Sequence, residues 1–495
     1  MRISPREIRQ SYAVLKSIAR RWLDNGHVEQ AMEYIHYCVV LAQQFNWLYA
    51  DSELEQMEKE IGERLIPQTV SVYMPNPNRV VLFDDFCVTF ILAIQYLKAL
   101  LKAGKEIMLI HTRTTEREAN KQFFAYVEQL KGVRVEHIQE SDVCKRIQKL
   151  HDVIIDFRPS QVLLQLNGDS LVVPVLYRLP KSIKSYLINQ ADQMFWLGAG
   201  AIDYCIEFRP FGVAVSMERR GLKNNQLCML PFYPIHDKNS FEGFPKQAEG
   251  HITIFSGGDI YKTLDTKRAY WRLIKRLLDT YSEVRFLFAT KVNPLGDAFL
   301  NHFIADNHFE DRFISIGFRK DIYEVLKHSD IYMGTCPTSG SLMSQLAAIN
   351  ATPVLQYYYP GTPDDETEQA LCINDTFPIS FQDEEAFMQE ADRLIKDAKH
   401  RKAQGERIQK SMIQPEQFGK ALIQLLDTNE SPFPIETKYV NYELIDDRWY
   451  ELERCGLTNT LSYVCNLLSK ANSLHRVPTL FVKKQVLTLK NKLHL

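Results

Sequence analysis

The chain has 495 residues, a net charge of −2 and an ordinary globular composition, with 45% hydrophobic and 24% charged residues. A chain longer than roughly 250–300 residues usually splits into several cores, so we expect two to four domains. The near-zero charge gives no support to nucleic-acid binding by the whole molecule. The nine cysteines form no CxxC pair, which argues against a zinc ribbon or a thioredoxin-like site and favours a reducing compartment.

Residues 1–66 are predicted to be helical. Segment 27–45 places apolar residues at mixed spacings of three and four, as an amphipathic helix does. Asp51 and Ser52 stand where they would cap a further helix, which ends before Pro67. We expect this helical segment to dock on the main body or to mediate self-association.

The longest apolar stretch, 86–101, contains Gln95 and Lys98. It is shorter than the ~20 residues that a membrane-spanning helix needs, so we interpret it as a buried helix. The N-terminal residues lack the apolar core of a signal peptide. These features predict a cytoplasmic protein.

Apolar, strand-like runs alternate with helical patterns after the helical segment. Such alternation predicts right-handed βαβ units and a parallel sheet. Because the runs are continuously apolar, both faces of the sheet are expected to be covered. The predicted strands of this region are 79–85, 106–112, 133–138 and 152–157.

A polar stretch at 234–250, with Gly, Pro and Asn, is typical of a linker. A second alternating series follows it and begins with a strand that runs into a glycine turn at Ser256. Helices resume after residue 383. The further strands predicted in this series are 284–290, 312–318, 330–335 and 352–358.

The region from residue 427 is predicted to be a helical tail. From Arg454 onward it carries seven Lys or Arg residues and no Asp or Glu. We therefore expect an α/β fold with two Rossmann-like, doubly wound lobes in series, preceded and followed by helical segments. The expected domains are 1–66, 67–235, 250–426 and 427–495.

Ligands of open parallel sheets bind outside the carboxyl ends of the strands. In the first lobe this rule selects Asp84, Asp85, His111, Thr112 and Arg158. A histidine there can take a proton from a hydroxyl group near neutral pH. The alternative is that these side chains only make local hydrogen bonds at the strand ends.

In the second lobe the same rule selects the glycine turn of FSGGDIYKT, residues 255–263. Gly257 and Gly258 would let backbone N–H groups approach an anion beside Ser256, and Lys262 would add a positive charge. The spacing is neither that of a Walker motif nor GxGxxG. The alternative is a turn that needs glycine for its conformation alone.

Thr338, Ser339, Gly340 and Ser341 stand where a strand ends and a helix begins. Free N–H groups, the helix dipole and hydroxyl groups all favour a phosphate at such a position. The alternative is ordinary capping of the helix by serine or threonine.

Segment 190–212 places Trp196 beside two glycines and then presents Asp203, Glu207 and Arg209. Such a group can form a platform for a sugar, with charged residues for its hydroxyl groups or for proton transfer. The alternative is a core segment that contains an arginine–carboxylate pair. The sequence holds no HExxH, Asp-x-Asp or Gly-x-Ser-x-Gly, so neither metal-dependent nor serine hydrolysis is supported.

With these elements, residues 70–426 resemble the GT-B glycosyltransferases. Segment 317–355 is similar to the donor region of that superfamily, with Gly317 and Asp321, a Ser-Asp strand, the Ser/Gly-rich helix start, and a Pro-Val after an alanine-rich helix. The Phe-Trp-x-Gly segment at 195–198 resembles bacterial protein O-glycosyltransferases and the O-GlcNAc transferase group.

The resemblance implies roles for the selected residues. Those expected at the nucleotide-sugar diphosphate and nucleotide are Ser256, Gly257, Gly258, Lys262, Arg319, Thr338, Ser339, Gly340 and Ser341. Those expected on the acceptor side are Trp196, Glu207 and Arg209. The candidate catalytic bases are Asp84, Asp85, His111 and Asp203.

One position departs from the family pattern. Many members carry a ribose-binding glutamate seven residues before the Pro of the Pro-Val, where this chain has Leu346. Gln345, or an acid in 363–368, is expected to replace it, or the donor site is altered. The departure leaves open an inactive partner of another glycosyltransferase. A sugar-nucleotide epimerase on the same two-lobed fold is a second alternative, and the N-terminal helices leave open an assembly module with a vestigial catalytic body.

The resemblance implies a metal-independent transferase without cofactor, with a UDP-linked sugar as donor substrate and a protein or glycan as acceptor. The basic tail suits an anionic lipid surface at the inner face of the membrane or an acidic protein, although a solvated helix end is an equal interpretation. The N-terminal helices suit an oligomer.

Overall fold

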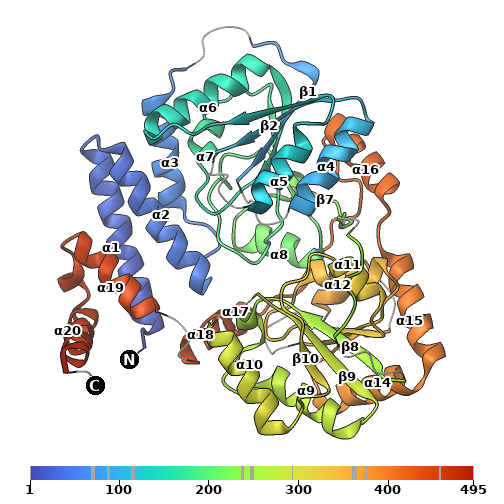
Figure 1. Cartoon of the computed structure of the whole chain (residues 1–495). Helices are drawn as coiled ribbons and strands as arrows, with labels where there is room; N and C mark the ends of the chain where they lie inside the picture. Colours follow the sequence, from blue (N-terminus) through green and yellow to red (C-terminus); the bar gives the residue numbers. More distant parts are fainter. Residues whose placement is uncertain are drawn as a thin grey trace. The chain divides into compact units, whose positions relative to one another are not determined.

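A computed structural model describes residues 2–68, 73–85, 90–112, 118–235, 239–245, 250–291, 294–358, 365–373, 377–455 and 459–493. The chain forms two compact units. Unit 1 comprises residues 1–230, 416–438 and 456–495, and unit 2 comprises 231–415 and 439–455 (Figure 1). Each unit is built around one parallel sheet.

Unit 1 contains a seven-stranded sheet of order β3-β2-β1-β4-β5-β6-β7, in which every pairing is parallel. This is the doubly wound order in which the first strand lies in the middle. The cores of β1, β2, β4, β5, β6 and β7 are buried, which explains their apolar runs, whereas the edge strand β3 is partly exposed. The strands are β1 (Asn76–Asp84), β2 (Glu106–His111), β3 (Val133–His137), β4 (Pro159–Gln165), β5 (Lys184–Ile188), β6 (Tyr204–Glu207) and β7 (Leu227–Met229).

Helices of unit 1 flank this sheet, and those from the two ends of the chain lie beyond it. They are α1 (Pro5–Asp24), α2 (Val28–Phe45), α3 (Ser52–Leu65), α4 (Phe90–Lys102), α5 (Glu118–Val127), α6 (Val143–Phe157), α7 (Val172–Leu176), α8 (Pro210–Glu218), α16 (Pro415–Thr428), α19 (Thr460–Lys470) and α20 (Pro478–Leu493).

Unit 2 repeats the plan with a six-stranded sheet of order β10-β9-β8-β11-β12-β13, again with parallel pairings only. Its strands are β8 (Ile252–Gly257), β9 (Val284–Ala289), β10 (Phe313–Ser315), β11 (Ile331–Met333), β12 (Val354–Tyr357) and β13 (Ser380–Phe381). Its helices are η2 (Ile260–Thr263), α9 (Ala269–Thr280), α10 (Pro294–Asn307), α11 (Ile322–Lys327), α12 (Ser341–Ile349), α13 (Glu366–Ala370), α14 (Glu384–Lys396), α15 (Ala398–Ser411), α17 (Tyr442–Trp449) and α18 (Glu451–Arg454). The two sheets confirm the predicted fold class.

The predicted strand at 152–157 is wrong, because these residues form the last turns of α6. The Asp142 side chain caps this helix, and Ile147, Leu150 and Ile154 are buried at helical spacing. The helix ends at Arg158, which has a φ of 55°, and the missed strand β4 follows it directly. Arg158 therefore lies at the amino end of a strand and not at a carboxyl end.

Helix α16 belongs to unit 1, whereas the expected second lobe extended to residue 426. The ring of Phe418 packs edge-on against Tyr96 of α4, with 5.1 Å between centroids. The side chain of Gln161 in β4 donates a hydrogen bond of 2.9 Å to the Leu426 carbonyl. The chain thus returns to its first sheet after it has built the second.

The helices at the two ends of the chain form part of the same unit. Asp51 caps α3 through hydrogen bonds from Glu53 N and Leu54 N, as the sequence predicted. The α3 helix packs so closely on α7 that a Cβ on Gly62 would lie 2.3 Å from the Pro174 carbonyl oxygen. The N-terminal helical segment therefore docks on the body of unit 1.

Among the described residues, no helix combines the length and the apolar character that crossing a bilayer requires.

Candidate functional site

The topology of unit 2 places its switch point at the carboxyl ends of β8 and β11. The strand order reverses at β8, which pairs with β9 on one side and β11 on the other. Doubly wound sheets bind ligands at this switch point. Gly258 leaves β8 with a φ of 151°, a conformation that favours glycine, and its N–H donates to the Ala289 carbonyl at 2.9 Å.

Lys262 extends across the glycine turn toward helix α12. A Cβ on Gly258 would lie 3.6 Å from its Cδ, and a Cβ on Gly340 would lie 3.9 Å from its Nζ. Within the described part of the chain, the Lys262 ammonium has no carboxylate or other hydrogen-bonding partner. Burial lowers the pKa of Lys262, and nearby Asp259 opposes this only in part.

The start of α12 faces this ammonium without a side-chain cap. Gly340 is the residue before the helix, and no side chain bonds the first N–H groups. The backbone of Thr338 is fixed by two bonds, because its N–H donates to the Lys262 carbonyl at 3.1 Å and its carbonyl accepts from the Thr335 hydroxyl at 2.7 Å. Ser339 and Ser341 are half-buried beside Gly340. An ammonium group, open N–H groups and the positive end of a helix dipole thus converge, and this combination favours an anion.

Two other predicted donor residues are engaged elsewhere. Ser256 is fully buried, and its hydroxyl accepts a 2.6 Å hydrogen bond from Tyr270, so it supports the turn from the core side. The guanidinium of Arg319 binds both carboxylate oxygens of Asp321 at 2.7 and 2.6 Å and the Gly243 carbonyl at 2.9 Å. Although burial opposes it, this pairing holds the pKa of Asp321 below its usual value.

The departure at Leu346 has a structural explanation. Leu346 is 2% exposed and belongs to the apolar core between β11, β12 and α12. Its neighbour Gln345 is also buried, and its Nε2 donates to the Ala370 carbonyl of α13 at 3.0 Å. The Oε1 atom of Gln345 has no hydrogen-bond partner among the described residues. Gln345 therefore ties α13 to α12, and α13 carries Glu366 from the acidic segment.

The carboxyl edge of the unit 1 sheet gathers Asp84, Asp85, His111 and Thr112 as predicted. Asp85 accepts hydrogen bonds from the hydroxyls of Thr112 at 2.6 Å and Ser170 at 2.8 Å. Nδ1 of His111 lies 2.8 Å from the Asp84 carbonyl oxygen. Because a carbonyl only accepts, Nδ1 carries the proton, and Nε2 is the basic nitrogen of the neutral ring.

Asp203 lies at the opposite edge of this sheet. It precedes β6 and accepts hydrogen bonds from the backbone N and the hydroxyl of Ser185, at 2.9 and 3.0 Å, near the start of β5. Its side chain therefore links the amino ends of β5 and β6 through hydrogen bonds. This placement removes it from the candidate bases at the carboxyl edge.

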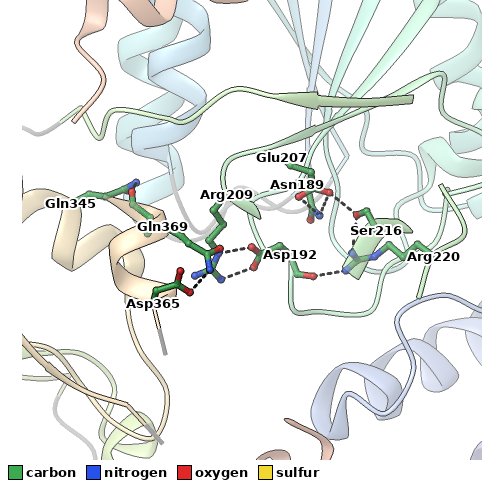
Figure 2. Close-up of polar contacts among 10 residues, drawn as sticks. Asn189, Asp192, Glu207, Arg209, Ser216, Arg220, Gln345, Asp365 and Gln369 are labelled. Atoms are coloured by element: carbon green, nitrogen blue, oxygen red, sulfur yellow. Dashed lines mark hydrogen bonds and ion pairs between the residues drawn. The ribbon is translucent and has the colours of Figure 1, made fainter. Parts of the chain in front are cut away.

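Glu207 and Arg209 belong to a network of buried polar groups (Figure 2). Asn189 Nδ2 donates to both oxygens of Glu207, at 2.9 and 3.0 Å, and Ser216 donates at 2.5 Å. Burial raises the pKa of Glu207. Arg209 binds Asp192 through two bonds of 2.6 and 2.8 Å. The alternative of a core segment with an arginine–carboxylate pair therefore describes these residues better than a sugar platform does.

Trp196 is 4% exposed and packs under the guanidinium of Arg220, 4.9 Å from the ring centroid. It lines a small cavity over the ends of β4 and β5, together with Gln43 of α2 and Asn189. The sequence did not single out Asn189 or Asp192, although both follow the apolar run of β5. If residues 184–188 had been predicted as a strand, Asn189 and Asp192 would have been selected, because they follow its carboxyl end.

Glu55 was also missed, although it fixes the loop after Trp196. Its carboxylate accepts hydrogen bonds from the N–H groups of Gly198 and Ala199, at 2.6 and 3.0 Å, and from the Tyr177 hydroxyl at 2.8 Å. Burial raises the pKa of Glu55, and these hydrogen bonds oppose the rise. No sequence motif marks this contact, because it joins α3 to a loop more than 140 positions away.

No protein-family model matches the chain, and no curated protein matches it. Solved structures do match in fold. An O-GlcNAc transferase mutant of Thermobaculum terrenum is 13% identical, with a TM-score of 0.52 over 90% of this chain and 85% of its own. A putative UDP-N-acetylglucosamine 2-epimerase of Listeria monocytogenes is 10% identical, with a TM-score of 0.53 over 74% of this chain and 100% of its own.

A third match is the HepE protein of Anabaena, solved in complex with UDP and glucose. It is 10% identical, with a TM-score of 0.50 over 71% of this chain and 99% of its own. At such identities the likeness establishes the fold alone. The chain therefore has a GT-B-like α/β fold with two Rossmann-like lobes, as the sequence predicted.

Proposed function

We propose that the protein transfers a sugar from a UDP-linked donor to a hydroxyl group of a protein or glycan. One observation carries this proposal: the Lys262 ammonium has no carboxylate partner in the described chain and stands between Gly258 and the uncapped start of α12. Lys262 is half-buried, and a partly desolvated ammonium costs stability unless an anion compensates it. A diphosphate supplies two adjacent anionic groups, one for Lys262 and one for the helix N–H groups.

In the proposed reaction the bond between the sugar C1 and the diphosphate oxygen breaks, and a bond from C1 to the acceptor oxygen forms. Lys262 and the α12 N–H groups stabilise the negative charge that develops on the leaving diphosphate. The acceptor proton goes to a base. His111 is the candidate in unit 1, because the Asp84 carbonyl fixes its tautomer with Nε2 basic.

Nucleotide binding tests the first half of the proposal. We expect UDP to raise the melting temperature of the wild-type protein and to bind in calorimetry. Lys262→Met should weaken UDP binding roughly 10- to 100-fold, the range for a charge-assisted hydrogen bond. Lys399→Met, which removes an exposed lysine of α15 in the same unit, should bind UDP normally. If no nucleoside diphosphate binds, the proposed transferase activity is wrong. That result would favour an inactive partner of another glycosyltransferase.

Product analysis tests the second half of the proposal, the transfer of the sugar. Incubation of UDP-sugars with the protein, with and without candidate acceptors, should yield UDP only when an acceptor is present. His111→Asn should lower kcat roughly 100- to 10,000-fold and leave the UDP Kd unchanged. Conversion of the donor to an epimer without acceptor would instead support a sugar-nucleotide epimerase, which the fold also accommodates.

A further inference from the structure

Helix α20 in unit 1 carries exposed apolar side chains. Phe481, Val482 and Val486 are 41%, 57% and 36% exposed. They lie at helical spacings of one, four and five, so they share one side of the helix, whereas Leu480 is fully buried. A helix that is apolar toward its own core and also toward the outside has a second surface to cover.

The sequence around this apolar side is rich in basic residues. Residues 459–493 contain six Lys or Arg and no Asp or Glu, in a chain whose net charge is −2. Nζ of Lys483 donates to the Arg2 carbonyl at 2.8 Å and to the Glu7 carboxylate at 2.7 Å. The start of α20 therefore lies beside the start of α1, at the same end of unit 1 (Figure 1).

Helix α1 adds two arginines to this end of the unit. Arg6 and Arg9 are exposed and line an open depression together with Pro5, Gln10 and Ala13. In the described part of the chain, neither guanidinium has a carboxylate partner. Glu7, the acid between them, is already bound to Lys483.

We propose that the surface formed by α20 and the first turns of α1, here the α1/α20 surface, binds an anionic lipid bilayer. The exposed apolar side chains of α20 would enter the interface between headgroups and acyl chains, and the basic side chains would contact lipid phosphates. Two copies of this surface would repel each other, because both are positive. An anionic bilayer supplies the opposite charge and an apolar phase together, so it fits better than a second copy of the chain.

Sedimentation with vesicles tests this proposal. The full-length protein should sediment with vesicles of phosphatidylcholine and phosphatidylglycerol, not with phosphatidylcholine alone, and high salt should release it. The double variant Phe481→Ser/Val482→Ser and the double variant Arg6→Glu/Arg9→Glu should each weaken binding about tenfold or more.

Two matched controls isolate the surface. Leu444→Ser removes an apolar side chain that is 44% exposed in unit 2, and Lys399→Glu/Lys402→Glu reverses two exposed charges of α15. Both should bind vesicles like the wild type, and every variant should keep the wild-type melting temperature. Equal binding to uncharged vesicles, no binding at low salt, or dimerisation that Phe481→Ser/Val482→Ser abolishes would each overturn the proposal. The assay uses no nucleotide, so its outcome is independent of the proposed transferase activity.

Discussion

The two units share one sheet topology but treat the charged groups at the carboxyl edge differently. In unit 1 the protein itself satisfies them: Asp85 accepts two hydroxyls, and Glu207 accepts an amide and a hydroxyl. In unit 2 the described chain gives the Lys262 ammonium no hydrogen-bonding partner beside an uncapped helix, although Asp259 lies nearby. A charge that is compensated within the protein supports the fold, whereas an uncompensated one is available to a ligand.

The largest expected effect is on stability, and it concerns the carboxylates of unit 1 that are hydrogen-bonded within the protein. Glu55→Ala removes the acceptor of the Gly198 and Ala199 N–H groups and of the Tyr177 hydroxyl. We expect a loss of roughly 3 kcal/mol in the free energy of unfolding, because buried donors lose their partner. Chemical denaturation measures it. Glu63→Ala, on the exposed side of α3, should change stability by less than about 0.5 kcal/mol. Equal losses in both variants would contradict the role of Glu55.

The pH dependence of UDP binding is the next effect in size. In the proposed site Lys262 holds the diphosphate only while protonated, and burial lowers its pKa. Affinity should therefore be full below that pKa and fall as the pH rises through it, by about tenfold per pH unit. The fall should begin at a lower pH than an ordinary lysine would show. Calorimetric titration across the alkaline range measures this fall, and Lys262→Arg should bind without it. A wild-type affinity that does not change with pH would show that Lys262 does not bind the diphosphate.

Glu58 breaks the pattern within unit 1, because it is fully buried and neither carboxylate oxygen has a described hydrogen-bond partner. Burial raises its pKa well above the usual value, and the charges of Glu55 and Asp169 add to this. The folded protein therefore keeps a proton that the unfolded chain releases. Stability should fall as the pH rises above about 4.5, by about 1.4 kcal/mol per pH unit until the folded protein also loses the proton. Glu58→Gln should flatten this fall, because its amide does not titrate. Melting curves at acidic and neutral pH test it, with Glu63→Gln as the control.

The smallest effect is expected at Lys262 in the absence of nucleotide. Because its burial disfavours the ammonium, Lys262→Met should raise the melting temperature of the free protein by about 1–2 °C. The same variant should lose the further rise that UDP gives to the wild type. A variant that is less stable without nucleotide would show that Lys262 supports the fold, as the unit 1 carboxylates do.

The sequence by itself determined the two-lobed α/β fold class, the strands β1 to β3 of unit 1 and β8 to β12 of unit 2, the capped helix α3, and the positions of Lys262 and the α12 start. These follow from local patterns: apolar runs, a cap at Asp51, and glycines and hydroxyls next to strand ends. It did not predict β5, β6, β7 and β13. It misplaced β4, because the apolar residues of 152–157 fit the end of α6 as well as a strand.

Only the tertiary structure decided which polar residues are already satisfied. Ser256 bonds Tyr270, Arg319 bonds Asp321, and Asp203 fastens the amino edge of the sheet. Long-range contacts of this kind leave no periodic signal, because the partners are brought together by the sheet order and not by spacing along the chain. The physical distinction between a structural charge and a ligand-binding one is therefore a property of the folded neighbourhood.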